Sequence, residues 1–569
     1  MSKQIEVDWL VAGSGAAGMT GAVVAHELGG EVLLVEKEPM WGGTTCKSGG
    51  VAWIPGNHRQ AEHGVIDSIE DGYQYLKGLI GDSVSEPRLR AYAERAQEML
   101  QFMMQHSHVD FTPLPAYMDY YENVAGYKPG GRSMDPGTIH LRRLGEDGLH
   151  MRDDYANLLP FSVTVPEGRA LGDMNLKSYL LGAWLVLRYL LDIPARLKGR
   201  RDQRLALGQA LVAKLRLSMK ERGIPLWLNA PIRGLLYENG RVVGAEIERD
   251  GEAVTVRARR GVLLGTGGFS RNAELRRQYQ HPAVGGDWTA SCPGATGDGI
   301  LLGQKLGAAL GFMGSAWWSP TVVLPDGEAR LALIAGKAYP HSIMVNRAGK
   351  RFTNEAAPYE DVVKDQLASE SRGEGAVPCF LVFDATFRRK YPAGNIRPGK
   401  LETDGLLPDA FWDSGLLTRA DSIGELATET GIDGLELRRT LDRFNKHARL
   451  GEDPDFGRGA THHDRYYADA KVQPNPCLGP VETPPFYALR VEAGDLDTKG
   501  GLLCDEHGRV LNEAGDPIPG LYAAGNTSAA VMGDTYPGAG ATIGSAMTFA
   551  YLAAQHAFRG EAAKEQAHD

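Results

Sequence analysis

Two short apolar runs near the N-terminus have the length and composition of buried parallel strands. The first covers residues 7–12 and ends in glycines, and the second covers residues 31–35. Between them, residues 16–28 are rich in alanine and have helical spacing. A strand, helix and strand within about 30 residues is the size of one βαβ crossover. The pattern predicts an α/β fold that starts almost at the first residue and leaves no room for a signal peptide.

Similar runs recur far along the chain. Residues 262–264 lead into several glycines, residues 520–526 look like a strand entering a glycine turn, and residues 541–558 have the pattern of a closing helix. Strands that end in glycine at such distant positions predict one sheet built from discontinuous segments. We therefore expect a Rossmann-like domain made of residues 1–315 and 493–569.

The stretch between these segments has a different texture. Residues 316–492 contain more Pro, Trp and Asp and only short segments. A chain of 569 residues exceeds the size of one hydrophobic core, so a second domain is expected. We predict that residues 316–492 form an inserted α+β catalytic domain.

Composition narrows the class of protein. With 43% apolar and 23% charged residues, the chain resembles an ordinary soluble globular protein. Its formal net charge of -10 argues against nucleic acid as the main partner. The five cysteines are scattered without a CxxC pair, which indicates neither a zinc site nor a disulfide framework. A reduced, cytoplasmic compartment is the expectation.

The first strand ends in a G-x-G-x-x-G motif at residues 13–18. Gly13 permits the tight turn, Gly15 lets the backbone approach a pyrophosphate, and Gly18 lets the helix pack closely. The helix N-terminus then offers N–H groups and a partial positive charge to the phosphate. Glu36, at the end of the second strand, has the spacing of a ribose-binding carboxylate. The segment predicts a dinucleotide site.

A second glycine-rich loop, residues 42–50, favours FAD over NAD because it can follow the flavin half of a longer cofactor. This loop and residues 520–526 resemble flavoproteins of the fumarate reductase and succinate dehydrogenase superfamily. The loop contains no histidine for a covalent flavin linkage, so a non-covalent FAD is expected. The cofactor-binding residues expected from the motif and the resemblance are Gly13, Gly15, Ala16, Ala17, Gly18, Glu36, Lys37, Gly43, Thr44, Thr45, Ser48, Gly49, Gly50, Gly267, Asp298, Gly525, Asn526, Ala541 and Thr542.

Longer segments resemble one branch of that superfamily, the 3-ketosteroid Δ1-dehydrogenases. The segments are residues 42–45 with 53–55, residues 351–359, residues 494–501 and residues 533–542. The resemblance spans most of the chain. It implies an enzyme that introduces a C1–C2 double bond into the steroid A ring, by proton abstraction at C2 and hydride transfer from C1 to flavin N5. It also implies an external electron acceptor, either a quinone or another carrier.

The same resemblance implies four catalytic residues, Tyr120, Tyr359, Tyr536 and Gly540. A phenol O–H and a backbone N–H aimed at one ketone oxygen form an oxyanion hole, which suits Tyr536 and Gly540. A phenol has a pKa near 10, so a tyrosine that acts as a base needs a neighbour that stabilises its anion or relays the proton. Tyr359 and Tyr120 are expected to form that pair.

Three rival functions stay open at this point. They are a 3-ketosteroid Δ4-(5α)-dehydrogenase, a fumarate reductase-like flavoprotein and a non-catalytic flavin electron carrier. Fumarate reduction needs cationic side chains for a dicarboxylate, and Tyr536 stands where that superfamily has an Arg. Asp495 and Asp497 are predicted to be solvated loop residues, and His462-His463 lacks a third ligand for a metal site. No metal site is predicted.

An insertion at about residues 158–216 contains a long apolar run, residues 179–191, interrupted by an arginine. The run is shorter than a membrane-spanning helix requires. The basic residues Lys198, Arg200, Arg201 and Arg204 follow closely. Apolar and aromatic side chains beside a basic cluster suit a segment lying in the bilayer interface. The alternatives are peripheral contact with the inner face of the cell membrane, or an amphipathic helix buried against the protein or a subunit partner.

Overall fold

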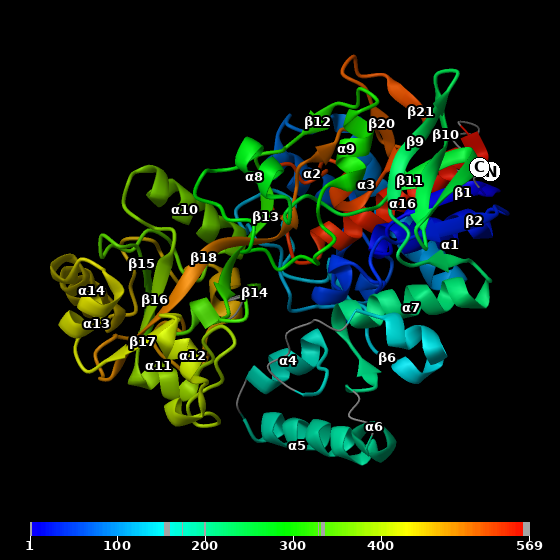
Figure 1. Ribbon diagram of the computed structural model, residues 1–569. Helices are drawn as coiled ribbons and strands as arrows, with labels where there is room; N and C mark the ends of the chain where they lie inside the picture. The colour runs from blue at the N-terminus through cyan, green and yellow to red at the C-terminus, as the bar shows by residue number, and fades with distance from the viewer. Residues whose placement is uncertain are drawn as a thin grey trace. The chain divides into compact units, whose positions relative to one another are not determined.

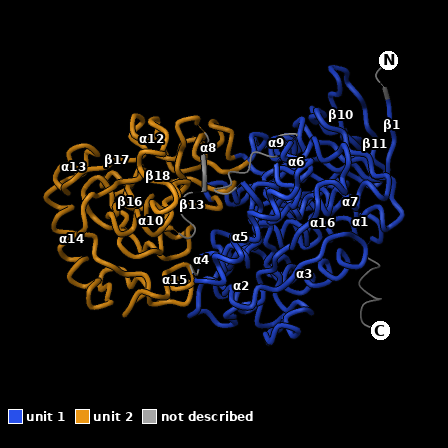
Figure 2. The backbone as a smooth tube through the Cα atoms, turned by 90° about the horizontal axis from the view of Figure 1, so that it is seen from below, with its two compact units in different colours: residues 1–269, 292–315, 498–569 blue, residues 270–291, 316–497 orange. Residues whose placement is uncertain are grey.

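The computed structural model describes residues 3–152, 160–172, 175–197, 201–327, 329–331 and 336–560 (Figure 1). The chain forms two compact units (Figure 2). The first unit comprises Met1–Phe269, Cys292–Ser315 and Thr498–Asp569, and the second comprises Ser270–Ser291 and Ala316–Asp497. Residues 270–291 and 493–497, which the predicted Rossmann-like domain included, pack with the second unit. The functional domain assignment itself stays a prediction.

An eight-stranded sheet forms the centre of the first unit. Its strands come from three distant parts of the chain, which confirms the prediction of a discontinuous α/β fold. In spatial order they are β20 (Arg509–Leu511), β21 (Pro517–Ala523), β11 (Glu252–Leu264), β1 (Lys3–Ala12), β2 (Val32–Val35) and β8 (Leu226–Trp227), with β10 (Arg241–Arg249) and β9 (Ile232–Glu238) added at β11.

The parallel strands of this sheet end at one common edge. In the register, Ala12 lies opposite both Val35 and Leu264, and Leu264 lies opposite Ala523. In open α/β sheets, ligands bind in the crevice outside the carboxyl ends of the strands. The loops that follow these four residues are therefore brought to one place.

Helices cover one face of this sheet. Helix α1 (Ala16–Glu27) packs against β1, β2 and the long C-terminal helix α16 (Ala541–Arg559). Almost every side chain of α1 is buried, and its small residues allow a close approach to the sheet. A Cβ at Gly21 would lie 2.4 Å from the Leu263 side chain. The outer helices are α7 (Leu207–Glu221), α3 (Glu86–His106) and α2 (Ile69–Ile80).

A small sheet supports the first turn of α16. It consists of β3 (Ala52–Trp53), β5 (Ser133–Asp135) and β4 (Thr112–Pro113). The Trp53 N–H donates to the Gly540 carbonyl at 3.0 Å, and the Ser133 hydroxyl donates to the Ala539 carbonyl at 2.8 Å. The remaining short elements of this unit are η1 (Thr44–Lys47), η2 (Gln60–His63), η3 (Leu141–His150), η6 (Gly525–Thr527), α9 (Asp298–Gln304), β6 (Ile139–His140), β7 (Arg204–Leu205), β12 (Leu310–Gly311) and β19 (Gly501–Leu502).

The second unit is α+β, with a six-stranded sheet and helices packed around it. The sheet order is β14 (Ala329–Leu331), β13 (Ala316–Val323), β18 (Phe486–Thr498), β16 (Cys379–Asp384) and β15 (Ser342–Val345), with β17 (Leu417–Ala420) paired to β18. The helices are α8 (Ala273–Tyr279), α10 (Tyr359–Ser371), α11 (Ala385–Lys390), α12 (Asp409–Asp413), α13 (Ile423–Thr430), α14 (Gly434–Ala448) and α15 (His462–Tyr466), with the turn η4 (Gly336–Ala338) and η5 (Asp404–Leu406).

The predicted solvation of Asp495 and Asp497 is wrong. Both residues lie in β18 and are buried. Asp495 accepts a hydrogen bond from Arg276 at 2.6 Å and another from the Thr289 hydroxyl at 2.6 Å. A buried carboxylate persists only when it is paired and hydrogen-bonded, which these contacts provide. Asp497 accepts a hydrogen bond from the Ser270 hydroxyl at 2.8 Å, so contacts within the second unit hold both aspartates.

Among the described residues of the insertion, helices α4 (Val165–Gly172), α5 (Leu176–Leu191) and α6 (Ile193–Leu197) precede β7 and α7. The predicted basic residues Lys198 and Arg200 lie outside the described residues. Helix α5 buries little of its apolar surface. Its exposed apolar side chains are Leu176, Tyr179, Leu180, Trp184, Val186, Leu187, Leu190 and Leu191.

Ion pairs hold the ends of the insertion. Arg188 contacts Asp202 at 2.8 Å, and the same carboxylate accepts the Ser162 N–H. Arg204 contacts Glu167 at 2.7 Å. Among the described helices, none combines the length and the apolar character needed to cross a membrane.

Candidate active site

Two of the three motif glycines are required by the fold itself. Gly13 has φ +97°, and an added Cβ would lie 2.2 Å from the Gly265 carbonyl oxygen. A Cβ at Gly18 would lie 1.8 Å from the Gly13 carbonyl oxygen. These two positions therefore fix the β1–α1 turn whether or not a ligand is bound.

Gly15 is different, because the protein leaves space beside it. Its φ of -76° suits any residue, and the nearest atom to an added Cβ is the Thr45 hydroxyl at 3.5 Å. Helix α1 has no side-chain N-cap and no acidic residue in its first turn. Within the described residues, no hydrogen bond engages the Gly15 or Ala17 N–H. Free donors, a positive helix end and space for a close approach fit a pyrophosphate.

Glu36 is buried at the end of β2 and is held firmly. The Ser14 N–H and hydroxyl donate to one carboxylate oxygen at 3.0 and 2.6 Å, and the Glu38 N–H donates to the other at 3.0 Å. Lys37, the next residue, contacts Asp298 at 2.7 Å. Asp298 begins α9, so two predicted cofactor residues from distant segments meet here.

The second glycine loop lies against the first. A Cβ at Gly43 would lie 3.5 Å from the Gly15 Cα. The Thr45 hydroxyl accepts the Ala16 N–H at 3.0 Å, and the Thr44 hydroxyl accepts the Cys292 N–H at 3.1 Å. Both predicted loops therefore form one continuous backbone surface.

The rest of this loop is shaped by Ser48 and α7. The Ser48 hydroxyl donates to the Thr45 carbonyl and accepts the Gly50 N–H. Gly49 leaves open space, since the nearest atom to an added Cβ is 4.0 Å away. Gly208 packs so closely that a Cβ would lie 1.9 Å from the Thr45 carbonyl oxygen.

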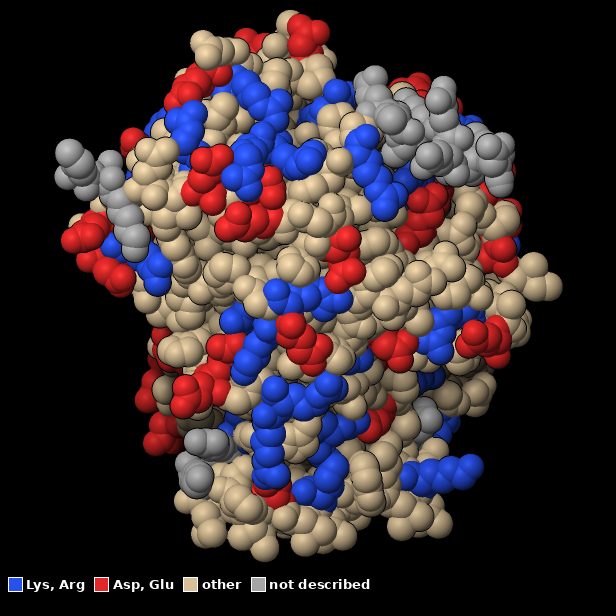
Figure 3. All heavy atoms as spheres, turned by 90° about the vertical axis from the view of Figure 1, so that its right-hand side faces the viewer, with Lys and Arg blue, Asp and Glu red and all other residues tan. Residues whose placement is uncertain are grey.

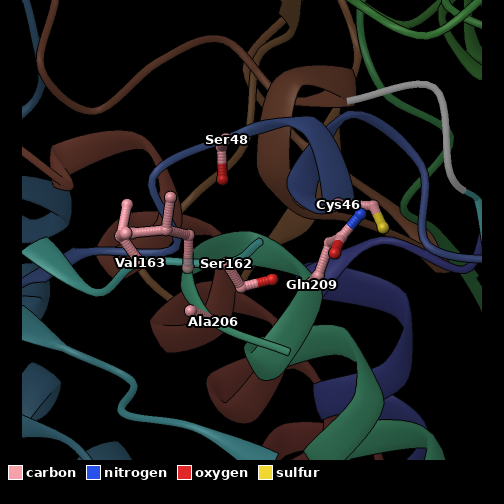
Figure 4. Close-up of a pocket in the computed structure, with 7 residues that line it drawn as sticks. Cys46, Ser48, Ser162, Val163, Ala206 and Gln209 are labelled. Carbon is pink, nitrogen blue, oxygen red and sulfur yellow. The ribbon is translucent and has the colours of Figure 1, made fainter. Parts of the chain in front are cut away.

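A small pocket joins this loop to the ends of the insertion (Figure 4). Its volume is about 220 Å³, including the open space at its mouth. The lining residues are Cys46, Ser48, Ser162, Val163, Ala206, Leu207 and Gln209. Residues near both ends of the insertion therefore lie beside the loop that is expected to follow the flavin.

The C-terminal segments close the same edge of the sheet. A Cβ at Gly525 would lie 3.3 Å from the Ala17 side chain, and the Thr527 hydroxyl donates to the Gly267 carbonyl at 3.1 Å. Asn526 lies between these two contacts in η6, and Ala541 and Thr542 form the first turn of α16. The structure thus gathers the predicted cofactor residues within one unit.

Tyr120 and Tyr536 are stacked in this unit. Their ring centroids are 5.6 Å apart and their planes differ by 21°. Both side chains are buried. The Tyr120 N–H donates to the Pro537 carbonyl at 3.0 Å, which joins the two segments through the backbone as well.

Gly540 is the N-cap of α16 and has φ +94°. A Cβ here would lie 2.5 Å from the Val51 carbonyl oxygen, so only glycine fits. No side chain caps this helix, its first turn lacks an acidic residue, and no hydrogen bond among the described residues engages the Gly540 N–H. An oxygen that gains negative charge would be stabilised at such a helix end.

Comparisons with known proteins show the family of this chain. Residues 8–543 match the FAD binding domain family. The chain is 42% identical to a 3-oxosteroid 1-dehydrogenase of Mycobacterium tuberculosis (strain ATCC 25618 / H37Rv), over 97% of this chain and 98% of the relative. The chain belongs to the 3-oxosteroid 1-dehydrogenase family of FAD-binding proteins. Its cofactor is FAD.

Two further proteins are similar to the chain over almost its whole length. The crystal structure of 3-ketosteroid delta1-dehydrogenase from Sterolibacterium denitrificans in complex with 1,4-androstadiene-3,17-dione matches with a TM-score of 0.94 and 40% identity, covering 98% of this chain and all of that one. A 4-oxocyclohex-2-ene-1-carboxylate 5-dehydrogenase from Sinomonas cyclohexanicum is 33% identical over 99% of this chain and 96% of the relative. The names of both proteins give a cyclic ketone as the substrate.

Tyr359, the third tyrosine predicted to be catalytic, belongs to the second unit. It is buried and is the first residue of α10. Lys337 binds the turn just before it, because its ammonium donates to the carbonyls of Glu355 and Ala357. The His463 ring contacts the Ala356 carbonyl at 3.2 Å. Burial lowers the pKa of Lys337 to about 7 and that of His463 to about 3.

Sequence reasoning assigned no role to Asp119, which precedes Tyr120. Asp119 is buried and contacts the Trp53 indole and the Arg132 guanidinium. Burial raises the pKa of Asp119 to about 6, against the opposing effect of Arg132. Trp53 lies in a segment that the resemblance singled out and Asp119 directly precedes Tyr120, but no local pattern connects the two residues.

Across the described residues, no group of three His, Cys, Asp or Glu side chains could hold a metal ion. His463 instead supports the turn before Tyr359.

Proposed function

We propose that the chain is an FAD-dependent 3-ketosteroid Δ1-dehydrogenase, which introduces a double bond between C1 and C2 of the steroid A ring. The observation that supports this most is the stack of Tyr120 on Tyr536 beside the N-terminus of α16. A phenol and a helix N-terminus close together suit a neutral ketone rather than a dicarboxylate, which needs cationic side chains.

FAD would be held by the edge of the first unit described above. Gly15 and Ala17 would face the pyrophosphate and Glu36 the ribose, while residues 43–50 would follow the flavin. When bound, FAD supplies the acceptor for the hydride that leaves C1.

Tyr536 and Gly540 would bind the ketone oxygen in this proposal. The phenol O–H and the main-chain N–H donate to that oxygen, and the donation strengthens as the oxygen gains charge. Stabilising the enolate oxygen is what makes the neighbouring C2–H bond acidic enough to break. The partial positive charge at the α16 N-terminus acts in the same direction.

Tyr359 would remove the C2 proton, with Tyr120 stabilising its anion or relaying the proton. A buried phenol is a poor base alone, because both its ordinary pKa and its burial favour the neutral form. Lys337 and His463 fix the turn that precedes Tyr359, so its backbone is well defined within the second unit.

The direct test is to incubate purified holoenzyme with androst-4-ene-3,17-dione and an artificial electron acceptor such as phenazine methosulfate. The proposal predicts androsta-1,4-diene-3,17-dione and reduced acceptor in equal amounts. Reduction of fumarate by a reduced viologen dye, without steroid turnover, would instead support a fumarate reductase-like flavoprotein. A protein that binds FAD but converts neither compound would be an electron carrier.

The electrons must leave the reduced enzyme, and a quinone and a soluble carrier both suit this role. Comparing turnover with menaquinone in vesicles and with a soluble dye separates these acceptors. A separate assay offers 4-oxocyclohexanecarboxylate in place of the steroid. If the enzyme oxidises this compound and not the steroid, its substrate is a smaller ring ketone.

We further propose that α5 and α6 dock on the inner face of the cell membrane. Trp184 is 55% exposed, Leu187 54% and Leu197 83%, so the apolar face has no cover in the described chain. Lys177 is exposed on the same helix, and Arg196 stacks over Tyr189. Figure 1 shows α5 and α6 at the lower edge of the view. Figure 3, which is turned about the vertical axis, shows few charged side chains along that lower edge and a group of Lys and Arg side chains just above it. This combination fits an anionic lipid surface.

Vesicle flotation tests this docking. The wild type should float with phosphatidylglycerol vesicles, and Trp184→Glu with Leu187→Glu should abolish flotation. Leu435→Glu is a matched control, because Leu435 is a 64% exposed leucine on α14 of the second unit. A wild type that stays in the soluble fraction, or that instead dimerises through this face, would contradict the proposal.

A further inference from the structure

The side chain of Asp119 connects the segments that hold Tyr120 and Gly540. Three donors point at its carboxylate. They are the Trp53 indole N–H at 2.7 Å, the Arg132 guanidinium at 2.6 Å and the Lys128 backbone N–H at 3.0 Å. Charge-assisted hydrogen bonds of this length hold a buried carboxylate in one place.

Trp53 extends this connection to Gly540. Its backbone N–H donates to the Gly540 carbonyl at 3.0 Å, and its carbonyl accepts the Tyr92 hydroxyl at 2.5 Å. The indole also packs beneath Gly538, where an added Cβ would lie 2.8 Å from the ring. Displacing Trp53 would therefore displace the first turn of α16.

Tyr120 follows Asp119 directly and is tied to the same region. Its N–H donates to the Pro537 carbonyl, and the Tyr75 hydroxyl donates to that carbonyl at 2.8 Å. The Tyr75 hydroxyl also accepts the Tyr121 N–H at 3.1 Å. Both sides of the tyrosine stack are thus fixed by contacts next to Asp119.

We propose that Asp119 is a positioning residue that sets the distance between the Tyr120 phenol and the Tyr536–Gly540 pair. The inference rests on the proposed function, since it concerns that reaction. Asp119 acts through Trp53 and through the backbone of Tyr120. Misplacement of reacting groups by about 1 Å can lower a rate on the order of 100-fold.

Arg132 makes it possible to bury this carboxylate. Its guanidinium lies between Asp119 and Asp67, and the Asp67 oxygens accept it at 2.7 and 2.9 Å. An asparagine at position 119 would present an NH₂ group to either Trp53 or Arg132, both of which are donors. Asp119→Asn therefore breaks the connection while it keeps the side-chain volume.

Asp67→Asn is the matched control. It also removes one buried carboxylate from Arg132, but Asp67 contacts neither Trp53 nor Tyr120. Both variants should lose stability, because each leaves a buried cation with one partner fewer. Only Asp119→Asn should change the geometry at the tyrosine stack.

The experiment compares the wild type and both variants as holoenzymes with equal FAD content. The readouts are kcat, KM and the deuterium isotope effect for androst-4-ene-3,17-dione labelled at C2. Asp119→Asn should lower kcat about 10- to 100-fold, change KM less than about threefold and increase the isotope effect at C2. Asp67→Asn should keep kcat within about threefold of the wild type, with an unchanged isotope effect.

Equal losses of kcat in the two variants, or an unchanged isotope effect in Asp119→Asn, would overturn the inference. If Asp119→Asn does not fold, Trp53→Phe replaces it, because this variant removes one donor and no charge. Full activity and an unchanged isotope effect in Trp53→Phe would then overturn it. A wild type that does not oxidise the steroid would count against the proposed function instead.

Discussion

Tyr120 and Tyr536 stack with ring centroids 5.6 Å apart, although a long stretch of the chain separates them. The backbone bond from Tyr120 to the Pro537 carbonyl fixes their separation. The stack lies beside the N-terminus of α16, where the Gly540 N–H is available. This arrangement gives each group a distinct and testable role.

Tyr536→Phe should lower kcat/KM for a 3-ketosteroid by about 100- to 1000-fold, which is typical for loss of one oxyanion-hole donor. The phenyl ring keeps the stack, so FAD content and thermal stability should change little. Steady-state kinetics and the flavin absorbance of the purified variant measure both quantities.

The control for this substitution is Tyr237→Phe, since Tyr237 is 51% exposed on β9. It should retain wild-type kinetics. If the Tyr536→Phe enzyme kept more than half of the wild-type kcat/KM, the result would show that Tyr536 does not belong to the oxyanion hole.

The glycines of the first turn should respond differently to the same change. Gly15→Ala should fold normally, because the added Cβ meets only the Thr45 hydroxyl, but it should weaken FAD binding at least about tenfold by occupying the pyrophosphate space. Gly18→Ala should fail to fold, since its Cβ would overlap the Gly13 carbonyl. FAD titration of the apoproteins and their thermal unfolding separate the two effects. Tight FAD binding by Gly15→Ala would place the pyrophosphate elsewhere.

Lys337 should make the stability of the second unit depend on pH. Burial lowers its pKa in the folded state to about 7, whereas an unfolded lysine has a pKa of about 10.4. Between these values the unfolded state binds more protons, so stability should rise with pH, by up to about 1.4 kcal/mol per pH unit. Below pH 7 both states are protonated and this contribution becomes constant.

Urea unfolding of the wild type and Lys337→Met from pH 7 to 10 measures this effect. The difference between the two proteins should change steadily over that range. Lys337 has four charged neighbours that remain in both proteins, namely Asp464, Arg458, Asp361 and Glu355. Parallel pH profiles would show that Lys337 is not a depressed ammonium in the fold.

Asp495→Asn should destabilise the second unit by about 3–5 kcal/mol, because it leaves the buried Arg276 without its charge partner. Denaturant unfolding checks this figure. Asp442→Asn is the matched control, since Asp442 is an exposed aspartate on α14 of the same unit. Equal stability of the two variants would contradict a structural role for Asp495.

The sequence predicted the first unit well where local pattern determines structure. The strand and helix before and after residues 13–18 are observed, as β1 and α1, within a few residues of the prediction. The C-terminal helix is likewise observed as α16. These elements have strong apolar periodicity, and turn glycines mark the strand ends.

Prediction failed where a side chain depends on a distant partner. Asp495 looked like a loop acid beside glycines, because its partner Arg276 lies far away in the sequence. The contacts of Asp119 with Trp53 and Arg132 were missed for the same reason. The roles of Tyr120, Tyr359, Tyr536 and Gly540 came from resemblance alone, and they stay predictions.

The most direct test of the whole account is the position of the double bond formed in 5α-androstane-3,17-dione. This steroid offers both the C1–C2 and the C4–C5 bond, and the product can be identified by NMR. The account predicts 5α-androst-1-ene-3,17-dione. Formation of androst-4-ene-3,17-dione instead would contradict it and assign a Δ4-(5α)-dehydrogenase.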